Sequence, residues 1–124
     1  MITVTNNPLM RNEDNVLFVE GMFRDVLVQV RDMVYSGYKL VSHPLFASSR
    51  MMFSPYRTVI VGEMQEKPSA FECQVIEDSI ITYDTSVAHR NRQPEHDGDY
   101  AVLDRELYRA TLEEIELLNS SHAI

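Results

Sequence analysis

Residues 16–41, VLFVEGMFRDVLVQVRDMVYSGYKLV, switch twice between two patterns of hydrophobic residues. The apolar run at 16–19 ends at a glycine and is typical of a buried strand. From 22 to 36 the apolar residues recur at helical spacing, and Gly37 falls where a helix cap is expected. A second apolar run follows at 38–41. The stretch therefore predicts a strand, an amphipathic helix and another strand, which is the repeating unit of an α/β fold.

Two further strands are predicted on either side of this unit. Residues 2–5 form an apolar, β-branched run, and residues 57–61 form another that stops at Gly62. The strands are apolar throughout, as is expected when both faces of a sheet are covered. We therefore predict a small three-layer α/β domain that spans residues 1–124, with a mostly parallel sheet of about four strands and flanking helices.

The second half of the chain predicts two more helices. Ser69, with a glutamate three residues later, forms a capping box that opens the first of them. The alternative is that 72–76 and 79–83 are two strands, which their β-branched residues favour. Residues 88–100 are polar and are predicted to form a connecting loop, and 102–119 form an acidic C-terminal helix.

The composition excludes several classes of function. The 124 residues include 19 acidic and 11 basic side chains, which give a net charge of −8. This charge repels phosphate backbones and anionic membrane surfaces, so we expect neither nucleic acid nor a membrane as partner. The lone Cys73 excludes a disulfide framework and a cysteine-rich zinc site, and we predict no metal and no cofactor. Without a targeting or membrane-spanning pattern, we expect a cytoplasmic protein.

Polar residues follow the predicted strands, at the edge where α/β sheets bind ligands. We predict ligand contacts from Asn6, Asn7, Ser42 and His43. The asparagines enter a helix at Pro8, where free N–H groups favour an anion, although the same residues also suit an ordinary turn and cap. His43 is the best candidate for an acid or base in catalysis; alternatively, its ring orders the loop. The predicted edge also collects Glu20, Gly21, Pro44, Gly62 and Glu63.

The segment 45–56 has no clear periodicity, and loops of that length are usually functional or disordered. It contains Met51, Met52 and Phe53 in succession. We predict that these side chains are buried, either in an interface with a partner or beneath the loop itself.

Several short motifs give the chain a family resemblance. They are Thr5-Asn6-Asn7-Pro8-Leu9, Asp25-Val26-Leu27, Val30-Arg31-Asp32, Gly37-Tyr38-Lys39-Leu40, His43-Pro44-Leu45 and Pro55-Tyr56. In this order they resemble the GrdX family, small proteins encoded with the glycine, sarcosine and betaine reductase complexes of anaerobic bacteria. The resemblance covers roughly residues 2–85, and the segment after Leu45 and the tail beyond about Ala88 depart from the pattern.

The resemblance implies a small accessory protein of amino-acid reductase metabolism that binds a partner or a small ligand. Its partners would be components of a glycine or betaine reductase complex, a small anion, or a second copy of the chain in a homodimer. The alternative is a small enzyme that uses His43 as acid or base on an anionic substrate held at the Asn6-Asn7 turn.

Overall fold

The computed structural model describes residues 1–88 and 93–121. Its strands are β1 (Ile2–Thr5), β2 (Val16–Phe18), β3 (Tyr38–Leu40) and β4 (Thr58–Met64). Its α-helices are α1 (Phe23–Tyr35), α2 (Ala70–Val87) and α3 (Asp97–Ser121). Three short 3₁₀ helices are η1 (Pro8–Met10), η2 (Ser49–Phe53) and η3 (Pro94–His96). The predicted α/β class is therefore confirmed.

The sheet is mixed, so the prediction of a mostly parallel sheet is wrong. The strand order is β2-β1-β4-β3, and β4 runs antiparallel to both of its neighbours. The prediction assumed that strands apolar throughout are parallel, but β4 is covered on both faces of the sheet and shows the same apolar pattern while running antiparallel. Because β4 is reversed, it begins where β1, β2 and β3 end. Arg57 joins that edge of the sheet, whereas Gly62 and Glu63 lie toward the opposite edge.

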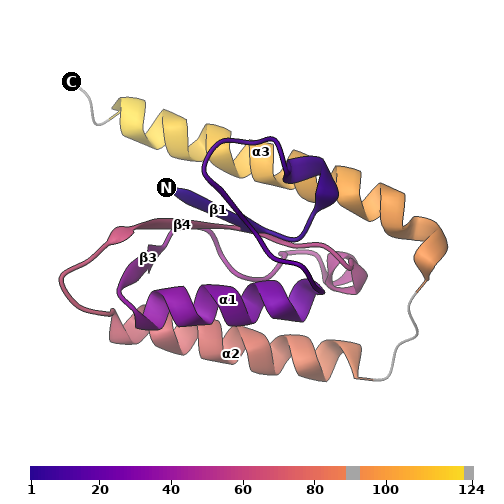
Figure 1. Ribbon diagram of the computed structural model, residues 1–124, viewed down its shortest axis with the longest axis horizontal. Coiled ribbons are helices and arrows are strands. Elements are labelled where there is room, and N and C mark those ends of the chain that lie inside the picture. The colour runs from indigo at the N-terminus through magenta and orange to yellow at the C-terminus, as the bar shows by residue number, and fades with distance from the viewer. Residues whose placement is uncertain (89–92, 122–124) are drawn as a thin grey trace.

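Helices lie on both sides of the sheet (Figure 1). Helices α1 and α2 pack over one side, where Val59 and Val61 of β4 join the main core. Helix α3 covers the other side, where Ile60 meets Met10 and Tyr108. The alternation of these β4 side chains follows from the two-residue period of a strand. The α3 side has the smaller apolar core, so polar contacts contribute more to holding α3 in place.

The predicted helix at 22–36 is confirmed as α1, and Gly37 follows it with a left-handed φ of 115°. Residues 72–83 are helical, so the alternative of two strands is wrong. The Ser69 side chain accepts a hydrogen bond from the Glu72 N–H (3.2 Å), as expected for a cap. The Glu72 carboxylate accepts from the Leu40 N–H (3.0 Å), which protects the free edge of β3.

Two predicted boundaries are wrong. Strand β4 continues through Gly62, where a methyl group would lie only 3.0 Å from Val41 Cγ2, so the glycine permits close strand packing. Helix α3 begins at Asp97 rather than at residue 102, and two aspartates in its first turn interact favourably with the helix dipole. Of the predicted loop, residues 89–92 lie outside the described residues. Within the described part of the chain, no helix is long and apolar enough to cross a membrane.

Candidate functional site

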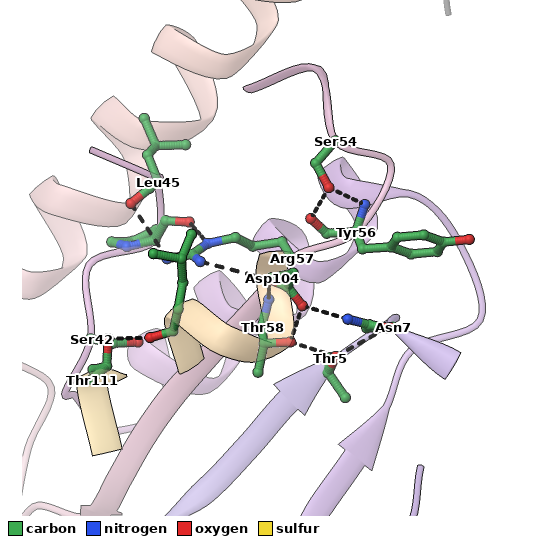
Figure 2. A network of polar contacts seen from close by, with 12 residues as sticks. Thr5, Asn7, Ser42, Leu45, Ser54, Tyr56, Arg57, Thr58, Asp104 and Thr111 are labelled. Carbon is green, nitrogen blue, oxygen red and sulfur yellow. Dashed lines mark hydrogen bonds and ion pairs between the residues drawn. The ribbon is translucent and has the colours of Figure 1, made fainter. Parts of the chain in front are cut away.

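A buried carboxylate, Asp104, fastens α3 to the sheet (Figure 2). It is fully buried and accepts hydrogen bonds from the Thr58 N–H (3.0 Å), the Thr58 hydroxyl (2.6 Å) and Asn7 Nδ2 (2.9 Å). The Thr5 and Thr58 hydroxyls lie 2.8 Å apart and continue the network. Three donors from β4 and from the turn after β1 thus satisfy a charge that burial alone would make costly.

Arg57 lies beside this network and is itself almost completely buried. Its Nε donates to the Pro44 carbonyl (2.7 Å) and its Nη2 to the His43 carbonyl (2.7 Å), while Phe46 supports the guanidinium at 4.1 Å. Its Nη1 lies 3.9 Å from Asp104 Oδ1 and makes no hydrogen bond within the described residues. Burial lowers the pKa of Arg57 to about 10, and the Asp104 carboxylate opposes this shift. The side chain is therefore a cation at neutral pH with one nitrogen still available.

Arg57 lines a cleft of about 580 Å³ between the segment after β3, strand β4 and helix α3. Apolar side chains, among them Phe46, Ile60 and Leu107, form part of its walls. The polar and charged side chains that line the cleft are Ser42, His43, Arg57, Thr58, Tyr108, Thr111 and Glu114. A cleft that combines apolar and polar groups with one buried cation suits a small anionic ligand.

The structure brings two of the four predicted ligand residues to this cleft. Ser42 and His43 line it, but the Ser42 Oγ already accepts the Ile60 N–H (2.8 Å). His43 is exposed, and its Nδ1 accepts the Leu45 N–H (3.0 Å). That bond uses Nδ1 as an acceptor and leaves Nε2 as the nitrogen able to contact a ligand. The loop-ordering role and the ligand role of His43 are thus compatible.

Asn6 and Asn7 do not line the cleft. Both are buried, and the Asn6 side chain connects three segments of the chain. Its Nδ2 donates to the carbonyls of Gly21 (2.9 Å) and Pro55 (2.8 Å), and its Oδ1 accepts the Arg57 N–H (2.9 Å). These contacts give Asn6 a structural role, and its contact with a ligand stays a prediction.

Asn7 is the cap of η1, because its Oδ1 accepts the Leu9 N–H (3.0 Å). Its Nδ2 donates to the Ala101 carbonyl (2.8 Å) and to Asp104 (2.9 Å), so both polar atoms of the side chain are bound within the protein. The Asn6-Asn7 turn thus forms an ordinary turn and cap, and anion binding at this turn stays a prediction.

The loop methionines are buried within their own chain, and Met52 belongs to the main core. This removes the support that they would have given to a partner interface. Phe53 lines a second cleft of about 430 Å³ together with Arg50, Tyr100 and other residues near the start of α3. Among the described residues, no three His, Cys, Asp or Glu side chains are grouped so that they could hold a metal ion.

Sequence reasoning missed Arg57 and Asp104 as parts of a site. The available signal was a charged residue within a buried pattern: Asp104 lies between Ala101 and Tyr108 on the inner face of α3, and Arg57 opens an apolar strand. Such charges are rarely buried without a partner, so each of them predicts one.

Comparison with known proteins supports the family resemblance that the sequence motifs carry. The family model described as GrdX-like protein matches residues 2–113, so the match extends beyond residue 85 into α3 and includes Asp104. Searches of curated proteins and of solved structures give no match. A match over most of the chain, with Arg57 and Asp104 inside the matched range, means that the chain belongs to the GrdX-like protein family.

Proposed function

We propose that this GrdX-like protein is an accessory protein of glycine, sarcosine and betaine reductase metabolism, and that it acts by binding. Its ligand is a small anion held in the cleft beside Arg57. The metabolic setting is what the resemblance to the GrdX family implies, and the match over residues 2–113 supports that resemblance. The observation that carries the ligand is a buried guanidinium with an unused nitrogen in a cleft of about 580 Å³.

The charge balance of the cleft favours a ligand with a single negative charge. Asp104 lies 3.9 Å from Arg57, beyond hydrogen-bond distance, so it offsets the charge of the guanidinium without occupying its free nitrogen. Glu114, which also lines the cleft, adds a negative charge that repels highly charged anions such as phosphate dianion. A small monocarboxylate with a short apolar body fits both the single cation and the apolar walls.

Replacing Glu114 by glutamine is expected to strengthen anion binding, because it removes the repelling charge from the wall. The charge is exposed, so the gain is about two- to fivefold, which corresponds to up to about 1 kcal/mol. Isothermal titration with acetate, propionate and phosphate at constant ionic strength measures it. Glu116→Gln, an equal charge change on the same helix outside the cleft, is the control. Heat of binding absent for all three anions, or equal gains in both variants, would refute the cleft as the anion site.

The affinity is also expected to depend on pH through Arg57. Affinity for acetate stays constant between pH 7 and 9 and begins to fall near pH 10, because the buried guanidinium loses its proton there. Since the pKa of Arg57 is lower in the folded than in the unfolded chain, Arg57 by itself makes folding more favourable as the pH rises through this range. A loss of binding without a loss of fold, followed by circular dichroism at each pH, therefore identifies the guanidinium. Affinity that is already lost between pH 7 and 9 would point to another group.

A direct test of the proposed partners uses the purified protein components of a glycine reductase complex. The proposal expects saturable binding to at least one component, measured by biolayer interferometry with the immobilised chain. If no component binds, the proposed accessory role is wrong. The proposed anion site in the cleft is tested separately, by the titrations above.

A second candidate function is an enzyme in which His43 acts as acid or base. The supporting observation is that His43 and Arg57 line the same cleft. In this form Arg57, and not the Asn6-Asn7 turn, holds the anionic group of the substrate. Turnover of a cleft-binding acid that His43→Gln abolishes, with unchanged affinity for acetate, would support the enzyme over the binding protein.

A further inference from the structure

One flank of α3 carries residues at alternating spacings of three and four. We call this set the seam: it consists of Tyr100, Leu103, Leu107, Ala110, Glu114 and Leu117. This is the spacing of the core positions of a coiled coil, in which two helices pack along their length. From Tyr100 to Leu117 the seam extends about 26 Å at a rise of about 1.5 Å per residue.

The fold itself does not use the seam as core. Helix α3 packs on the sheet through Ala101, Asp104 and Tyr108, which are buried on a neighbouring face. Leu107 in the seam is 43 % exposed and Leu117 is 70 % exposed. Apolar side chains at core spacing on an exposed helix face are the arrangement by which a helix binds a second helix.

Acidic residues border the seam at intervals of seven. Asp99, Glu106 and Glu113 each precede a seam residue, at the flanking positions where coiled coils place the charges that select their partner. Glu113 and Glu114 have no ion-pair partner among the described residues. They lie in the C-terminal half of α3, whose last turn has no basic residue.

The charges beside the seam determine which kind of helix can pack on it. In an antiparallel pair with a second copy of the chain, acidic flanks would face acidic flanks, and like charges at these positions oppose pairing. In a parallel pair, Glu106 and Glu113 would face Thr111 and Leu118, which offer them no cation. We propose that the seam binds an α-helix of another protein that has apolar residues at heptad spacing and lysine or arginine at the flanking positions. The partner's cations would also neutralise the charges that the C-terminal half of α3 leaves unpaired. This inference does not rest on an anion in the cleft.

The probe is a synthetic 21-residue helical peptide with leucine at the core positions and lysine at the flanking positions, labelled with fluorescein. Fluorescence anisotropy with the full chain is expected to show saturable binding, at least tenfold tighter than that of a peptide with glutamate at the flanks. Leu117→Ser weakens binding of the lysine peptide by about fivefold or more, as expected for a residue that contributes strongly to the binding energy. Glu113→Lys reverses part of the preference and favours the glutamate peptide. Neither residue lines a cleft, so both tests are separate from anion binding.

The matched controls lie on the same helix outside the seam: Val102→Ser, which like Leu107 is 43 % exposed in the native chain, and Glu116→Lys. Binding that these controls weaken as much as the seam variants do would overturn the proposal, because the peptide would then merely adhere to an acidic surface. A stable dimer by light scattering that Leu117→Ser dissociates would also overturn it, since a second copy would then occupy the seam. Loss of binding confined to Leu117→Ser and Glu113→Lys supports it.

Discussion

The Asp104→Ala variant is expected to lose about 3–5 kcal/mol of unfolding free energy, the range for breaking a buried ion pair by removing one partner. Without the carboxylate, the Arg57 guanidinium loses its counter-charge inside the protein. The Thr58 N–H and Asn7 Nδ2 also lose an acceptor, although Asn7 keeps the Ala101 carbonyl. Urea unfolding followed by circular dichroism measures the loss.

Because these contacts join α3 to the sheet, the variant should also show early loss of protection in the α3 amides by hydrogen exchange. Glu116→Ala is the control, since it removes an exposed acidic side chain from the same helix and should change stability by less than about 0.5 kcal/mol. A loss below about 1 kcal/mol for Asp104→Ala would mean that the apolar contacts of Tyr108 and Ile60 alone hold α3 in place.

The second large effect is expected for Phe23→Ala, with a loss of about 3–5 kcal/mol, the range for deleting a buried aromatic side chain. Phe23 is fully buried at the start of α1, where it stacks on Tyr83 at 4.5 Å and meets the edge of Phe46 at 5.7 Å. Phe46 in turn lies beneath the Arg57 guanidinium. The change therefore reaches from the core to the cleft, and we expect weaker acetate binding as well as lower stability.

Phe23→Leu separates these two effects, because it keeps most of the buried volume and should cost less than about 1.5 kcal/mol. If acetate affinity falls in the alanine variant and is kept in the leucine variant, packing behind Phe46 positions the guanidinium. Equal acetate affinity in both variants, measured at a temperature where each is folded, would mean that packing behind Phe46 does not position the guanidinium.

The helices and strands were largely predictable from the sequence, but the direction of β4 in the sheet was not. Each strand and helix leaves its own hydrophobic period in the chain, so α1 was predicted within one residue at each end. The direction of β4 depends on what lies between β3 and β4, and that is not a local property of either strand.

The site was predictable only in part, for a similar reason. Ser42 and His43 reach the cleft because they directly follow β3, as the rule for strand ends anticipates. Asn6 and Asn7 also follow a strand, but neighbouring backbone groups bind their amides, and these neighbours come from residues that are distant in the sequence. Arg57 belongs to the same edge only because β4 is reversed. Because the direction of β4 was predicted wrongly, Arg57 was not predicted to lie at this edge of the sheet.

The central position of β4 also determines when the chain can fold during its synthesis. Strand β3 bonds only to β4 in the described sheet, and β1 pairs with β4 across more than fifty residues, with Thr5 opposite Thr58. The sheet therefore stays incomplete until residue 64 has been added, which takes about 3–13 s at roughly 5–20 residues per second. Helix α3 and its Asp104 follow later still. Throughout that interval one edge of β1 and the apolar face of α1 are uncovered, so a nascent chain depends on chaperones or on speed of translation to avoid pairing with its neighbours.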